Sequence, residues 1–95
     1  MKKIIYLDFN AFLTNPQIVL LGEKEITRIK KAKIDLIEGV EVTFFDDDKD
    51  EFDKSNYICA DAILEFDKNE NVWLVKFKLD SDYYLEVSDN VVAYR

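Results

Sequence analysis

Carboxylates are concentrated in one short segment of this chain, between residues 46 and 53. The segment holds six carboxylates and one lysine, and the acidic residues are Asp46, Asp47, Asp48, Asp50, Glu51 and Asp53. Clustered carboxylates can hold a divalent cation or attract a basic partner. Because like charges this close together repel each other and stay solvated, the sequence predicts an exposed loop between two β-strands.

The acidic segment partly matches the loop of a calcium-binding EF-hand. If such a loop began at Asp46, its first, third and fifth positions would be the carboxylates Asp46, Asp48 and Asp50. Its sixth position, which favours glycine for a sharp turn, is Glu51, and its twelfth, which favours glutamate, is Tyr57. The pattern does not favour an EF-hand. We therefore expect no dedicated cofactor, with weak calcium or magnesium binding or a merely solvated loop as the two alternatives.

A second acidic position follows an apolar run at the start of the chain. Within the stretch from Ile4 to Leu13, an apolar strand ends in Asp8, which is followed by one spacer residue and Asn10. It is similar to the first strand of PIN-domain nucleases, and this resemblance over ten residues implies that Asp8 helps to bind a divalent metal. The remaining pattern of residues 40 to 95 is β rather than the alternating α/β of that family. The alternative is that Asp8 caps a turn with support from Asn10.

The side chains most used in catalysis are scarce. Histidine is absent, Cys59 is the single cysteine, and the glycines are Gly22 and Gly39. This composition excludes Ser/His/Asp and Cys/His catalysis, ordinary zinc sites and glycine-rich phosphate loops. We therefore identify no catalytic residues and expect a non-catalytic protein. Because Cys59 lies inside a strand pattern, we expect a buried and unreactive thiol.

Charge is unevenly distributed along the chain. Residues 1 to 34 carry seven Lys or Arg against three acids, whereas residues 35 to 95 carry six against seventeen, which gives the net charge of −7. The basic cluster contains Arg28, Lys30, Lys31 and Lys33. We interpret this cluster as a solvated face or as an intramolecular partner of the acidic segment. Because the whole molecule is negative, we expect no direct contact with nucleic acid.

The length of 95 residues and the hydrophobic content of 48% predict a single domain, residues 1–95, that folds by itself. The longest apolar run, from Ile18 to Leu21, is much shorter than a membrane span. We recognise no signal peptide and expect no membrane contact. With one cysteine and no export signal, the expected location is the cytoplasm.

Apolar and polar residues alternate from Val40 onward, and this period of two predicts β-strands. The expected strands cover about residues 3–9, 17–21, 40–45, 56–66, 71–79, 83–87 and 91–94. Residues 67 to 71 have the composition of a hairpin turn between two antiparallel strands. Residues 23 to 37 fit both a helical stripe and a strand. We interpret them as one helical turn or an irregular segment that leads into a strand.

These elements predict a mainly β fold. It would be a small, strongly bent antiparallel sheet or barrel with, at most, one short helix in the N-terminal half; the alternative is an α+β fold. The order of elements from Leu36 onward, with an acidic loop, a long strand, a hairpin and short closing strands, resembles an SH3-like small barrel. This resemblance covers residues 36 to 95, is topological, and implies a shape without an activity.

Aromatic residues fall into two groups. Phe44, Phe66, Trp73 and Phe77 keep consistent strand parities and are predicted core residues. Tyr57, Tyr83 and Tyr84 lie at strand starts and turns. We interpret these tyrosines as a contact patch beside the acidic segment, with bracing of the barrel ends as the alternative.

The sequence therefore favours a small acidic cytoplasmic binding module that docks on a basic protein partner, as an inhibitor, an immunity protein or a nucleic-acid mimic does. The expected partner site combines the six carboxylates of residues 46 to 53 with Tyr57, Tyr83 and Tyr84. One alternative is a metal-dependent hydrolase that uses Asp8 or the acidic segment. A further alternative is a structural module that self-associates through Val91–Tyr94, although we expect a monomer.

Overall fold

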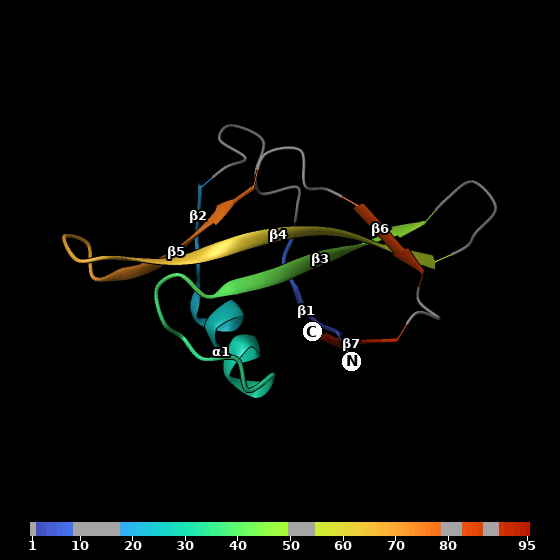
Figure 1. Ribbon diagram of the computed structural model, residues 1–95, viewed down its shortest axis with the longest axis horizontal. Helices are drawn as coiled ribbons and strands as arrows, with labels where there is room; N and C mark the ends of the chain where they lie inside the picture. Colours follow the sequence, from blue (N-terminus) through green and yellow to red (C-terminus); the bar gives the residue numbers. More distant parts are fainter. Residues whose placement is uncertain (1, 9–17, 50–54, 79–82, 87–89) are drawn as a thin grey trace.

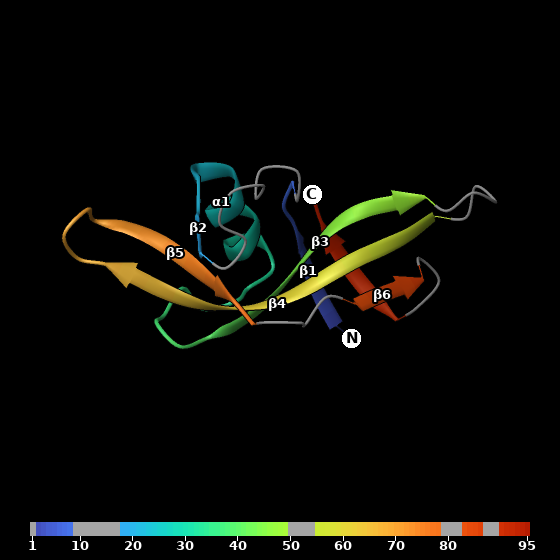
Figure 2. The same ribbon diagram turned by 90° about the horizontal axis from the view of Figure 1, so that it is seen from above.

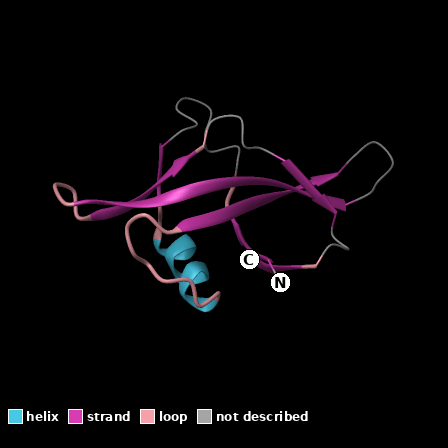
Figure 3. Ribbon diagram, in the orientation of Figure 1, coloured by secondary structure: helices cyan, strands magenta, loops and turns pink. Residues whose placement is uncertain are grey.

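The computed structural model describes residues 2–8, 18–49, 55–78, 83–86 and 90–95. Figures 1 and 3 show a sheet with a helix on one side of it. The elements of the described residues are β1 (Lys2–Tyr6), β2 (Ile18–Leu20), α1 (Glu23–Lys31), β3 (Glu41–Lys49), β4 (Ser55–Asp67), β5 (Val72–Phe77), β6 (Tyr83–Glu86) and β7 (Val91–Tyr94). The mainly β fold class with one short helix is confirmed.

The strands form a mixed sheet. Its order is β2-β5-β4-β3-β1-β7, and β6 pairs with β4 beside this path. The expected sheet was antiparallel, and the pairings of β2 to β6 among themselves are, but β1 runs parallel to both β3 and β7. These parallel pairings join distant parts of the chain, so no local turn signal in the sequence indicates them. The SH3-like arrangement expected for residues 36 to 95 gains no support from this order.

The hairpin of β3 and β4 forms the long axis of the sheet. Its pairs run from Glu41 opposite Ile63 to Lys49 opposite Ser55. The predicted boundary at residue 45 is therefore wrong, because Asp46, Asp47 and Asp48 continue the strand instead of forming a loop. Successive strand side chains point to opposite faces, which separates the carboxylates of Asp46 and Asp47 while the backbone stays paired with β4. Asp50, Glu51 and Asp53 lie outside the described residues.

The segment from 23 to 37 corrects a second expectation, because it contains a helix of nine residues and no strand. Glu23 and Glu25 lie in the first turn and basic residues in the last turn, where both suit the helix dipole. Ile29 is fully buried on the face that packs on the sheet. The helix is followed by Lys33 in a left-handed conformation with φ 59°.

The connection between α1 and β3 explains the alternating pattern that resembled a strand. Ile34 and Leu36 are partly buried and pack against the core although neither belongs to a strand. The side-chain amine of Lys3 also donates a hydrogen bond of 2.7 Å to the carbonyl of Ala32, which ties the end of α1 to β1. Burial of alternate residues in an irregular segment thus imitates a β pattern.

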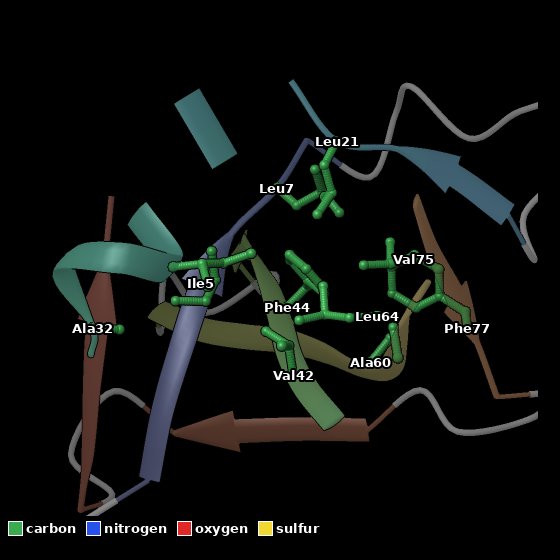
Figure 4. Close-up of a cluster of buried hydrophobic side chains, with 12 residues drawn as sticks. Ile5, Leu7, Leu21, Ala32, Val42, Phe44, Ala60, Leu64, Val75 and Phe77 are labelled. Carbon is green, nitrogen blue, oxygen red and sulfur yellow. The ribbon is translucent and has the colours of Figure 1, made fainter. Parts of the chain in front are cut away.

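Two apolar clusters lie on opposite faces of the sheet. The helix-side cluster lies between the sheet and α1 and includes Ile5, Phe44, Leu64 and Phe77, several of which are labelled in Figure 4. The outer cluster consists of Ile4, Phe45, Tyr57 and Cys59, with Tyr6, Val91 and Ala93 packed against it. Of the predicted core aromatics, Phe44 and Phe77 are buried, whereas Phe66 and Trp73 are partly exposed and contact each other at 5.1 Å between ring centroids.

Candidate functional site

The strand register brings predicted partner-binding positions together at one end of the sheet. Between β3 and β4, the pairs are Asp46 with Ile58, Asp47 with Tyr57 and Asp48 with Asn56. On the other side of β4, Ile58 pairs with Tyr84 of β6. Tyr83 lies opposite Cys59 on the same pair of strands. Figure 2 shows β6 beside the end of β4 that lies away from β5. We call this region, formed by Asp46–Asp48, residues 56–59 and β6, the acidic end.

Asp47 is the centre of the best-defined contact at the acidic end. Its two carboxylate oxygens accept hydrogen bonds of 2.6 and 2.7 Å from Nη1 and Nη2 of Arg95. The guanidinium of Arg95 also lies over the ring of Phe45, at 5.2 Å from the centroid. The hydrogen bond to Asp47 raises the pKa of Arg95, and a side-chain hydrogen bond with Tyr57 adds to this effect. We call Asp47, Tyr57 and Phe45 the Asp47 cradle.

Aromatic packing fixes the base of this cradle. The rings of Phe45 and Tyr57 meet edge to face at 4.9 Å, and Phe45 meets Tyr6 in the same way at 5.7 Å. Phe45 is fully buried and Tyr57 is 8% exposed. Tyr57 therefore braces the end of the sheet, the second of its two expected roles, and its role in binding a partner stays a prediction.

Tyr6 lies among several charged groups beside the acidic end. The negative charge of Asp46 is the main cause of a raised pKa for Tyr6, and burial, Asp8 and Asp47 act in the same direction. The guanidinium of Arg28 lies 5.3 Å from the centroid of the Tyr6 ring. Asp8 and Asp46, which belong to separate sequence motifs, thus act on the same phenol.

The metal hypothesis concerns the carboxylates of the acidic segment and Asp8. Within the described ranges, no three His, Cys, Asp or Glu side chains are grouped so that they could hold a metal ion. Asn10, the second residue of the nuclease-like pattern, lies outside those ranges. Binding of calcium or magnesium by the acidic segment stays a prediction.

The basic cluster does not supply the partner of Asp47. Arg28 pairs with Glu25 at 3.7 Å within α1, and Lys30, Lys31 and Lys33 are exposed. The partner is Arg95, which sequence reasoning missed together with Phe45, Tyr6 and the contact of Tyr6 with Arg28. These residues are joined by the register of β1, β3 and β7, and the pairing of Arg95 with Asp47 spans 48 positions. No local pattern indicates such a contact.

Cys59 is buried, as predicted. It is 0% exposed, and its pKa is raised to about 11, chiefly by burial. Asp61 adds to this rise and Lys2 opposes it. The thiol is therefore protonated near neutral pH and is a poor nucleophile.

Comparison with known proteins gives no functional information: no family model, no curated protein and no solved structure matches this chain. Among the residues that the structure describes, no helix is long and apolar enough to cross a membrane. The acidic end is therefore assessed from its own geometry and charge.

Proposed function

We propose that this protein is a small acidic cytoplasmic binding module whose acidic end docks on a basic protein partner, in the manner of an inhibitor, an immunity protein or a nucleic-acid mimic. The observation that carries the proposal is the register that brings Asp46, Asp47 and Asp48 to the same end of the sheet as Tyr57 and the two tyrosine positions of β6, with Asp47 directly opposite Tyr57. A net charge of −7 favours encounter with a positively charged surface. Tyrosine beside charged groups is typical of interface centres.

The position of the acidic end suits docking. It lies at the end of the β3–β4 hairpin, away from α1 (Figure 1). Asp47 is exposed over 52% of its side chain although it accepts two hydrogen bonds. A change to Asp47 therefore affects the surface and removes no contact of the helix-side cluster.

The test is a pull-down at low salt from extracts of the source cell. The acidic-end variant carries Asp46→Asn, Asp48→Asn and Asp50→Asn. The charge-matched control carries Glu38→Gln, Glu65→Gln and Glu70→Gln, three exposed acids near the β4–β5 turn. We expect the wild type and the control to retain a basic protein that the acidic-end variant loses. Equal capture by both variants, or capture of no basic protein by the wild type, would contradict the proposal.

A second candidate function is self-association through β7. Among the described strands, β7 is the last in its direction of the sheet, and Val91–Tyr94 contains no charge and no proline that would protect an edge. The carbonyl of Asn90 accepts from the amide of Lys2. By alternation along the strand, the backbone groups of Val91 and Ala93 face away from β1.

Sedimentation of the wild type and of Val91→Pro tests this second candidate. Proline at Val91 removes an outward donor and preserves the bonds to β1, so it should block edge pairing without unfolding β7. Self-association predicts a wild-type mass of twice 11.2 kDa and a monomeric variant. A wild type that stays monomeric at high concentration would exclude this candidate.

A further inference from the structure

The Asp47 cradle has the composition of a guanidinium-binding site. A carboxylate accepts hydrogen bonds from both Nη atoms of Arg95, at 2.6 and 2.7 Å, and the centroid of the Phe45 ring lies 5.2 Å from the guanidinium carbon. This combination favours arginine over lysine, because an ammonium group cannot form the paired hydrogen bonds and stacks less well. A site of this composition distinguishes arginine from positive charge in general.

The cradle is held in place independently of the arginine that fills it. Asp47 and Tyr57 are direct partners in the β3–β4 register, as are Phe45 and Cys59 two positions along the strands on the same face. The edge-to-face contact of Phe45 with Tyr57 belongs to the buried outer cluster. Removal of the Arg95 side chain should thus leave the carboxylate and the ring in position.

The arginine that occupies the cradle is accessible to solvent and to a competitor. The side chains of Arg95 and Asp47 are each 52% exposed. An ion pair with this exposure is screened by salt, and a second arginine would form the same paired hydrogen bonds in place of Arg95. A second arginine can therefore replace Arg95 at small cost.

We propose that the Asp47 cradle is the arginine-binding site of this module, that Arg95 occupies it in the free protein, and that an arginine of the basic partner displaces Arg95 on binding. The inference rests on the proposed function for the nature of the partner. It adds a chemical requirement, since the partner must present an arginine. It also makes Arg95 a competitor within the same chain.

Chemical complementation of an emptied cradle tests the inference. The variant Arg95→Gln is titrated with N-acetyl-arginine methylamide and, separately, with the matching lysine compound, and the backbone amide signals of Asp47 and Tyr57 are followed by NMR. We expect Arg95→Gln to bind the arginine compound about threefold or more tighter than the wild type does. The lysine compound should bind about threefold or more weaker than the arginine compound.

The double variant Asp47→Asn with Arg95→Gln is the matched control and should lose this preference for arginine. Equal binding of the arginine compound by the single and double variants would overturn the inference, as would equal binding of the arginine and lysine compounds. If Arg95→Gln does not fold, Arg95→Lys takes its place, and the arginine compound should then shift the same two signals; unchanged signals would overturn the inference. No partner protein enters this experiment, so it can fail while the pull-down succeeds, and the reverse.

Discussion

Single residues show how the same strand serves opposite environments. Phe44 packs in the helix-side cluster, its neighbour Phe45 packs in the outer cluster, and Asp47 lies two positions further on the outer face. The alternation of apolar and polar residues predicted that Phe44 is a core residue. It does not indicate that the opposite face of the sheet also carries an apolar cluster. The role of Arg95 could not be predicted either, because its contact with Asp47 depends on the nonlocal pairing of β1 with β7.

Cys59 provides a test of burial on the outer face. Its pKa is about 11 in the folded chain, against an ordinary value of 9.0. Below pH 9 both states hold the proton, so the full stability is present. As the pH rises from 9 to 11 the unfolded chain loses its thiol proton first, and stability should fall by at most about 1.4 kcal/mol per pH unit.

Urea unfolding of the wild type and Cys59→Ala between pH 8 and 11 measures this effect. Tyrosines and lysines titrate in the same range, so the difference in slope between the two proteins is the relevant quantity. The slope should be steeper for the wild type. Parallel pH profiles would mean that Cys59 is not shielded from water.

At the scale of elements, helix α1 contributes one fully buried side chain to the helix-side cluster. Ile29 is 0% exposed and packs in this cluster. Ile29→Ala should lower the free energy of unfolding by about 2–5 kcal/mol, because it leaves a cavity that the sheet cannot fill. The neighbouring exposed change Lys30→Ala should stay within about 0.5 kcal/mol of the wild type. A loss below about 1 kcal/mol for Ile29→Ala in urea unfolding would contradict this packing.

The sequence predicted elements well where local signals agree. Strands β4 and β5 follow their period of two, and the turn between them is closed by Asp67, whose carboxylate accepts from the amides of Asn69 and Glu70 at 2.9 and 3.2 Å. The length of β3 could not be predicted from the sequence. Charge repulsion among its aspartates opposes a strand, whereas backbone pairing with β4 and the contact of Asp47 with Arg95 support one. The helix was obscured because Ile34 and Leu36 are partly buried in an irregular connection.

At the scale of the whole molecule, two surface regions of opposite charge lie apart. The exposed lysines of α1 and its C-terminal connection lie on the helix side, whereas Asp46–Asp48 lie at the end of the β3–β4 hairpin (Figure 1). The candidate site could be predicted in part, since its carboxylates and tyrosines stand out in the sequence. The geometry that joins them depends on the whole sheet.

The association rate of the module with the basic protein captured in the pull-down tests the central claim most directly. Rates are measured over a range of salt concentrations for the wild type, the acidic-end variant and the charge-matched control, after urea unfolding has shown that no variant loses more than about 2 kcal/mol of stability. The proposal predicts that the acidic-end variant associates more slowly than the other two at low salt and approaches the wild-type rate at high salt, where charges are screened. An acidic-end variant that associates as fast as the wild type at low salt would contradict it and would place the functional surface elsewhere on the molecule.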